Sequence, residues 1–154
     1  MAFFNTQYGT RVAHNDLCKV ATRSPIHYIC TESEDMKKTL VIGASPNPVR
    51  FSNKMVKSLI RHDFSVVPLG IRKGDIAGID ILTERTFIPN IHTISLYIGA
   101  SRQVDYYDYI LSLKPKRIIF NPGTYNAELI ELAEQKNIEC IVDCALIMLS
   151  NGNY

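Results

Sequence analysis

Short apolar runs alternate with longer amphipathic stretches along the chain from residue 38 onward. Runs of this length that are apolar throughout are typical of strands in a sheet covered on both faces. The alternation therefore predicts parallel strands joined by helices. The predicted strands are Thr39–Gly43, Ser65–Leu69, Thr93–Ile98, Arg117–Asn121 and Glu139–Val142.

The stretches between these strands carry apolar residues at helical spacing. Two apolar stripes fall at 55–60 and 129–133, and a third helix is expected over about Ser101–Leu113, where Lys114-Pro115 provides a stop. Right-handed crossovers between about five parallel strands give a doubly wound sheet with helices on both faces. The sequence therefore predicts an α/β fold with strand order 3-2-1-4-5.

The first 35 residues lack this regular pattern and end in the polar run Thr31–Asp35. Met36 and the residues after it read like a translation start that leads into the first strand. We expect residues 1–35 to be a flexible arm or an upstream extension, and residues 36–154 to be a single domain. A targeting role is less favoured, because the arm holds four acidic residues and only three Lys or Arg.

Composition indicates a globular protein, because 46% of the residues are hydrophobic and 21% are charged, with both signs interspersed. The net charge is only +2 and Lys and Arg form no stripe, which argues against a nucleic-acid partner. No apolar run approaches the roughly 20 residues of a membrane helix, and no signal peptide is recognisable. A cytoplasmic location is expected. The four cysteines show no C-x-x-C spacing and are expected to be reduced, with no metal site.

Ligands of doubly wound sheets bind at the carboxyl ends of the strands where the winding reverses. For the predicted strand order, these are the loops after the first and fourth strands. In the first loop, Gly43, Ala44 and Ser45 precede a helix whose free amides favour a phosphate. Arg50 lies in the same loop and is a further candidate contact. The segment has only one of the three glycines of a dinucleotide motif, and it could also be a simple structural turn.

The end of the second strand distinguishes between nucleotides. A site for NAD usually places a carboxylate there for the ribose hydroxyls, whereas this chain has Arg72 and Lys73. Two cations suit a phosphate on or near a ribose, as in NADP or coenzyme A (CoA). The alternative is that both residues only solvate a surface loop.

Several motifs, in this order and spacing, resemble the small bacterial CoA-binding domain proteins: Val41–Pro48, Val66–Pro68, Lys73-Gly74 with Gly78, and Asn121-Pro122-Gly123. The resemblance covers about residues 37–149. It implies a Rossmann-like CoA-binding domain, similar to that of the succinyl-CoA synthetase alpha subunit.

The resemblance also implies site residues. The loop of Gly43, Ala44 and Ser45 would meet the CoA phosphates, and Lys73 matches a basic residue after the second strand. Further matching positions are Ile98, Gly99 and Ala100 after the third strand, and Asn121, Pro122 and Gly123 after the fourth. Many relatives have a glutamine-containing sequence in place of Asn121-Pro122.

The chain lacks the phosphohistidine domain and the partner subunit that the synthetases need, so the resemblance does not imply an enzyme. Cys144 follows the fifth strand at the same edge as the ligand loops, and the matching family position is often cysteine. One hypothesis is a reversible mixed disulfide between Cys144 and CoA; the alternative is that Cys144 packs as a small apolar residue. Cys140 is expected to face the core and to be inert.

The favoured function is therefore binding of CoA or an acyl-CoA without catalysis. The alternatives are an NADP-dependent oxidoreductase, an acyl-transfer enzyme fragment, or an interaction subunit that binds no nucleotide. Tyr106, Tyr107 and Tyr109 cannot all face the same way on the third helix. They suggest either a homodimer contact or partial burial.

Overall fold

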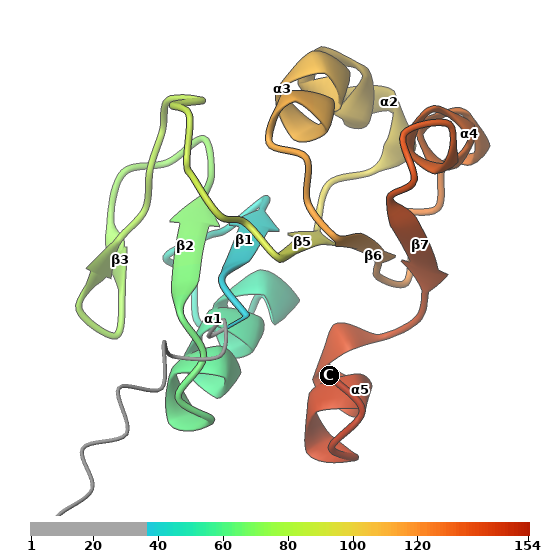
Figure 1. Ribbon diagram of the computed structural model, residues 1–154. Coiled ribbons are helices and arrows are strands. Elements are labelled where there is room, and N and C mark those ends of the chain that lie inside the picture. Colours follow the sequence, from blue (N-terminus) through green and yellow to red (C-terminus); the bar gives the residue numbers. More distant parts are fainter. Residues whose placement is uncertain (1–36) are drawn as a thin grey trace, which may run out of the picture. The chain divides into compact units, whose positions relative to one another are not determined.

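The computed structural model describes residues 37–154 and contains one parallel sheet of five strands (Figure 1). The predicted α/β fold is confirmed, and each predicted strand is present with shifts of at most two residues at its ends. The strands are β1 (Thr39–Ile42), β2 (Val66–Leu69), β5 (Thr93–Leu96), β6 (Arg117–Phe120) and β7 (Glu139–Val142). The predictions about residues 1–35 and Met36 lie outside the described residues.

The predicted strand order was wrong. The sheet runs β2-β1-β5-β6-β7, so the third strand of the sheet lies between the first and the fourth and gives the order 2-1-3-4-5. The reason is that the outer edge of β2 is already occupied. Leu82 pairs with Leu69 there, and the Leu82 amide donates to the Pro68 carbonyl at 2.9 Å. The chain must therefore cross to the free side of β1 before it forms β5.

A short antiparallel hairpin stands beside this edge and was not predicted. It consists of β3 (Asp75–Ile76) and β4 (Ile79–Asp80), joined by Ala77 and Gly78. Both turn residues have positive φ, 52° and 83°, as the tightest hairpin turns require. The hairpin takes the place of a crossover helix between β2 and β5.

Helices cover both faces of the sheet, as predicted. On one face lie α1 (Phe51–Arg61) and α5 (Ala145–Ser150), and on the other lie the remaining helices (Figure 1). The predicted third helix is broken into three short pieces, and α5 was not predicted. The elements of the second face are α2 (Ala100–Gln103), η1 (Val104–Tyr106), α3 (Tyr107–Ser112) and α4 (Ala127–Glu134).

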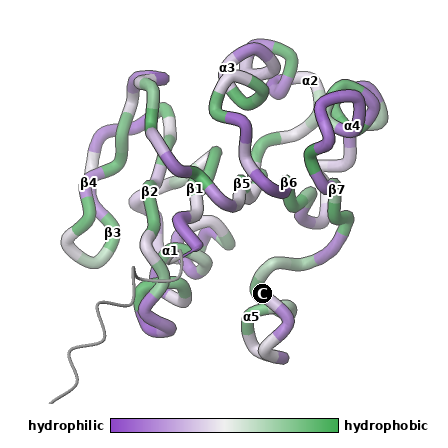
Figure 2. The backbone as a smooth tube through the Cα atoms, in the orientation of Figure 1, coloured by the Kyte–Doolittle hydropathy of each residue, from purple (hydrophilic) through white to green (hydrophobic). Residues whose placement is uncertain are grey.

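Each face of the sheet has its own apolar core. Leu40 and Ile42 of β1 pack toward α3 and α4, whereas Val41 between them packs toward α1 and α5. This alternation follows from the two-residue period of a strand. The helices alternate hydrophobic and hydrophilic residues along their length (Figure 2), and the hydrophobic ones supply the inner stripe.

The three neighbouring tyrosines are all partly buried and all engaged within the chain. The Tyr107 hydroxyl donates to Glu128 at 3.0 Å, the Tyr109 hydroxyl donates to the Thr86 carbonyl at 2.9 Å, and Arg85 stacks on the Tyr106 ring. The partial-burial alternative is therefore correct. A homodimer remains an untested prediction. Within residues 37–154, none of the helices combines the length and apolar character that crossing a membrane would require.

Candidate functional site

The observed strand order moves the point where the winding reverses to the gap between β1 and β5. The relevant loops therefore follow β1 and β5, and not the first and fourth strands as predicted. The two loops touch at Gly43, which has φ of 95°. A Cβ atom on Gly43 would lie 2.8 Å from Ile98 Cγ2 and 2.9 Å from the Tyr97 carbonyl oxygen, so only glycine fits this position.

The loop after β2 joins the same site through two more close approaches. A Cβ atom on Gly70 would collide with the Ala44 carbonyl oxygen. A Cβ atom on Gly74 would lie 3.0 Å from Pro46 Cβ. The segment that carries Arg72 and Lys73 therefore runs beside the β1 loop.

The free backbone donors of this site are not those of Gly43 and Ala44. Both of these amides donate to the Leu69 carbonyl, at 2.8 and 2.9 Å, and so tie the loop to β2. Unused donors lie further along the chain, at the start of α1. Within the described part of the chain, the amides of Phe51 and Ser52 have no acceptor, and Arg50 caps the helix without a side-chain hydrogen bond.

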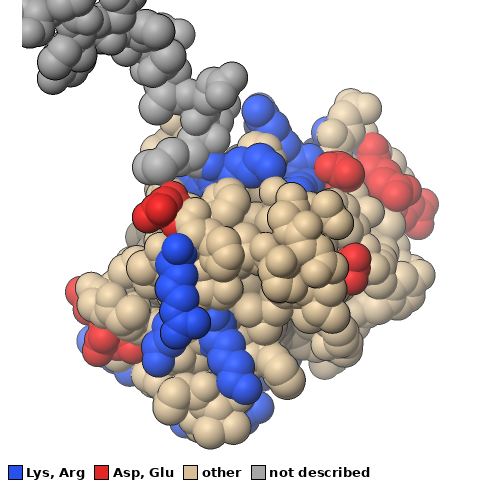
Figure 3. Space-filling view, turned by 90° about the horizontal axis from the view of Figure 1, so that it is seen from below, with Lys and Arg blue, Asp and Glu red and all other residues tan. Residues whose placement is uncertain are grey.

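The charge of α1 also favours an anion. The helix carries Lys54, Lys57 and Arg61 and no acidic residue, and Arg50 precedes it. Seen from the side of α1 and α5, Lys and Arg side chains gather over part of the surface, while its middle is largely uncharged (Figure 3). The positive end of the helix dipole adds to this potential at the Phe51 and Ser52 amides.

Gln103 links the loops after β5 and β6, although its sequence position gave no sign of a role. Its side chain is fully buried, and Nε2 donates to the carbonyls of Ile98 at 2.9 Å and Thr124 at 2.7 Å. Its Oε1 accepts from Asn126 Nδ2 at 3.0 Å. This bridge fixes the position of Gly99 and Ala100, where α2 begins.

Asn121 lies beneath the β6 loop and makes all its side-chain hydrogen bonds within the chain. Its Nδ2 donates to Ser95 Oγ at 2.9 Å and to the Leu96 carbonyl at 3.0 Å, and its Oδ1 accepts from the Ala145 amide at 2.9 Å. The side chain is therefore a brace that joins β5, β6 and α5. Pro122 and Gly123 of the same loop are exposed.

The two described cysteines have different surroundings. Burial, with smaller contributions from Glu134 and Glu139, raises the pKa of Cys140 to about 11, so this thiol stays protonated at neutral pH. That Cys140 is inert stays a prediction. Cys144 is partly exposed and precedes α5 at the ligand edge. Beside it, the Tyr97 hydroxyl is buried without a hydrogen-bond partner in the described residues, and burial raises its pKa well above the ordinary value. The mixed disulfide of Cys144 stays a prediction.

A hollow of about 350 Å³ opens next to Lys73, between the β3–β4 hairpin and the segment that leads to β5. Its lining combines charged, hydroxyl and aliphatic side chains. Residues 37–154 contain no group of three or more His, Cys, Asp or Glu side chains that could hold a metal ion.

Similar structures support the fold. The crystal structure of an uncharacterised protein shares 44% identity with this chain at a TM-score of 0.76, over 77% of this chain and 98% of that one. A hypothetical protein from Pyrococcus horikoshii is 23% identical at a TM-score of 0.68, over 75% of this chain and 82% of its own. A Thermus thermophilus protein is 16% identical at the same TM-score, over 77% and 90% of the two chains. The last two show the fold alone.

No curated protein matches the chain. A family model does: residues 37–150 match the model described as CoA binding domain, which covers the whole sheet and every loop of the site. The chain therefore belongs to the CoA binding domain family.

Proposed function

We propose that this protein binds CoA or an acyl-CoA at the carboxyl ends of β1, β2 and β5 and catalyses no reaction by itself. Family membership supports CoA binding in general. The observation that carries the proposal is the convergence of three loops at Gly43, Gly70 and Gly74. A side chain would collide with the neighbouring loop at Gly43 and Gly70 and would be crowded by it at Gly74. Such close backbone approach is typical of a nucleotide site at the switch point of a doubly wound sheet.

The residues of this site suit the anionic groups of CoA. The unpartnered amides of Phe51 and Ser52, together with Arg50, would receive the diphosphate. Arg72 and Lys73 would receive the 3′-phosphate of the ribose, since both are exposed on the adjoining loop. Gly43, Ala44 and Ser45 would shape the loop, and Ile98, Gly99 and Ala100 would flank the ligand.

Two other residues at this edge of the sheet would support a loop or lie near the thiol end of the ligand. We propose that Asn121 acts as a brace for the loop of Pro122 and Gly123, and that Cys144 lies toward the thiol end of the ligand. A cytoplasmic location stays a prediction, as do the identity of any acyl group and the absence of catalysis.

Calorimetric titration of the full chain with CoA, dephospho-CoA and NADPH in parallel tests the proposal. We expect CoA to bind in the micromolar range and NADPH not to bind. Replacing Arg72 and Lys73 together by Ala should weaken CoA at least tenfold and dephospho-CoA much less, because a charge-assisted hydrogen bond to phosphate contributes about 1.5 to 3 kcal/mol.

Lys136→Ala serves as the matched control, because Lys136 is an exposed lysine in the turn that follows α4. An equal loss of affinity for CoA and for dephospho-CoA would show that Arg72 and Lys73 do not contact the 3′-phosphate. Tight NADPH binding with substrate-dependent oxidation would support the oxidoreductase alternative instead.

A further inference from the structure

The helices that cover the two faces of the sheet carry opposite charge. Those of one face, α1 and α5, hold no acidic residue and three cations, Lys54, Lys57 and Arg61. Those of the other face hold one cation, Arg102, and five acidic residues. The five are Asp105, Asp108, Glu128, Glu131 and Glu134. The helices of one face are therefore positive as a group, and those of the other are negative.

The three cations of α1 form a stripe along the outer side of the helix. At about 100° per residue, positions 54, 57 and 61 fall within about 60° of one another, whereas the buried Met55 and Leu59 lie on the opposite side. Lys54 and Arg61 are exposed, and Lys57 is partly exposed. Along the chain these cations are separated by other residues, so the stripe exists only once the helix has formed.

The stripe has no compensating charge within the described residues. None of its three cations makes an ion pair with a carboxylate in residues 37–154, and the Lys54 ammonium lies only over the Phe51 ring, 5.1 Å from its centre. Like charges three or four positions apart on a helix repel one another. The arrangement therefore costs stability in the free chain, and a basic outer side of this kind is typical of helices that bind an anionic surface.

Two large apolar side chains are exposed on the same pair of helices. Phe51 at the start of α1 is 66% exposed, and Ile147 of α5 is 55% exposed. Seen from this side, the gathered Lys and Arg side chains lie beside a largely uncharged area (Figure 3). Cations next to single apolar side chains suit the surface of a membrane, where cations meet lipid phosphates and apolar groups enter the boundary of the acyl chains.

We infer that the α1–α5 face binds the surface of an anionic lipid membrane. Lys54, Lys57 and Arg61 meet the headgroups, and Phe51 and Ile147 enter the boundary below them. The same surface repels the acidic helices of the other face, so the membrane orients the chain as well as holding it. Binding of this kind lies on the membrane and requires no spanning helix. The inference does not depend on the proposed function.

A protein or a nucleic acid fits this face less well. The centre of a protein–protein interface is depleted of lysine, whereas two of the three cations of the stripe are lysines. Proteins that bind single-stranded nucleic acid combine cations with aromatic side chains on which bases stack. Ile147 is aliphatic and cannot stack on a base in this way, but it can enter a lipid surface.

Sedimentation of the full chain with sucrose-loaded vesicles tests the inference. Vesicles of phosphatidylcholine that contain about 30% phosphatidylglycerol are compared with vesicles of phosphatidylcholine alone, at low and at high salt. We expect binding to the anionic vesicles to be at least about tenfold stronger at low salt, and most of this difference to be lost at high salt because the charges are screened.

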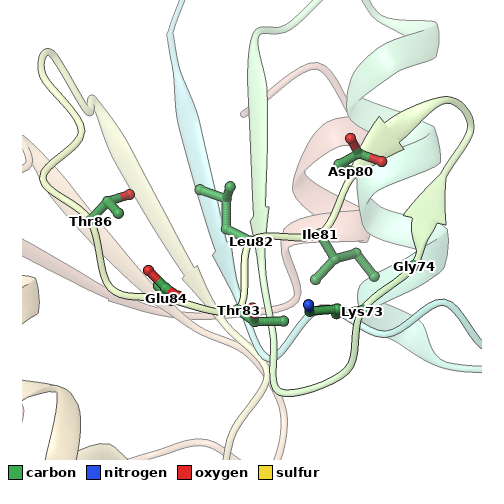
Figure 4. A pocket seen from close by; sticks show the side chains of 8 residues that line it. All are labelled: Lys73, Gly74, Asp80, Ile81, Leu82, Thr83, Glu84 and Thr86. Carbon is green, nitrogen blue, oxygen red and sulfur yellow. The ribbon is translucent and has the colours of Figure 1, made fainter.

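Replacing Lys54, Lys57 and Arg61 together by Gln should weaken binding to the anionic vesicles on the order of a hundredfold, since each cation near such a surface contributes about fivefold. The stability of the fold should not fall, because the repulsion within the stripe is removed. None of the three residues lines the hollow shown in Figure 4.

The matched control replaces Arg102, Lys114 and Lys136 by Gln, which removes the same charge from exposed positions outside α1 and α5. This variant should keep vesicle binding within about twofold of the unaltered chain. Equal binding to both kinds of vesicle, or an equal loss in the control variant, would overturn the inference. Tighter binding of a single-stranded RNA than of the anionic vesicles, lost in the stripe variant, would assign the stripe to a nucleic acid and overturn it too. CoA titration decides the proposed function separately.

Discussion

The two faces of the sheet are built from different kinds of residue. Toward α3 and α4, the central strands present only aliphatic and aromatic side chains, namely Leu40, Ile42, Ile94, Leu96, Ile118 and Phe120. Toward α1 and α5, the same strands bury polar side chains among the apolar ones, namely Thr39, Thr93, Ser95 and Arg117. The first face, called the apolar face below, gains stability from buried apolar area. The second, called the polar face, adds completed hydrogen bonds to an apolar core of its own.

The polar face is organised around Arg117 and Tyr154. Arg117 Nε donates to Thr93 Oγ1 at 2.9 Å, and its guanidinium lies 4.9 Å from the centre of the Tyr154 ring. The Tyr154 hydroxyl is 3.0 Å from Thr39 Oγ1, and its ring meets Phe64 edge-on. One Arg117 nitrogen, Nη2, is buried without a partner in the described residues. Polar burial on this face thus ties distant segments together at some cost in desolvation.

The largest expected effect is on the apolar face. Phe120→Ala should lower the free energy of unfolding by about 3 to 5 kcal/mol, because it removes a fully buried ring and leaves a cavity between the sheet and its helices. Urea denaturation followed by circular dichroism measures this loss. Phe87→Ala is the matched control, since Phe87 is 72% exposed and should change stability by less than about 0.5 kcal/mol. A similar loss in both variants would mean that the apolar face is not the main source of stability.

The next effect is specific to the polar face and depends on pH. Burial raises the pKa of Tyr154 from its ordinary value of 10.0 to about 12, against smaller lowering effects of Thr39 and Arg117. Because the folded pKa is the higher one, this contribution to stability is complete below pH 10 and is lost as the pH rises through about 12. The loss should amount to about 2 to 3 kcal/mol.

Tyr154→Phe isolates this contribution, because it keeps the ring against Phe64 and Arg117 but removes the ionisable group. Urea denaturation at several pH values between 9 and 12 should show the unaltered chain losing stability faster than the variant. Tyr97 also has a raised pKa, but it is present in both chains and cancels from the comparison. Parallel pH profiles would contradict the burial of a neutral Tyr154 hydroxyl.

The strands of the sheet were the part of the fold that the sequence predicted best. Short, mostly apolar runs located all five sheet strands, because the four strands other than the edge strand β7 are almost fully buried. The strand order failed because local patterns do not record which edge of β2 is free. Leu82 and the β3–β4 hairpin decide that question, and two-residue strands with an Ala77-Gly78 turn are too short to recognise from periodicity.

The candidate site was predicted in outline but not in its donors. Gly43 and the basic pair Arg72 and Lys73 pointed to the loops after β1 and β2, which lie side by side in the structure. The sequence could not show that the Gly43 and Ala44 amides are used by Leu69, or that Gln103 bridges two loops, because both depend on the observed packing. A polar residue in a predicted helix is ordinarily assigned to the exposed face, which hid the role of Gln103.

The smallest predicted effect would sharpen the contrast between the two faces. Ser95→Ala removes one hydrogen bond from Asn121 Nδ2, which keeps its second acceptor, the Leu96 carbonyl. Stability should therefore fall by only about 1 kcal/mol. If the polar face works as a connected network, the same substitution should cost almost nothing once Asn121 has already been changed to Ala. A double-mutant cycle in urea measures this coupling directly. Additive losses would show that Ser95 and Asn121 stabilise the sheet independently, and the polar face would then differ from the apolar one only in composition.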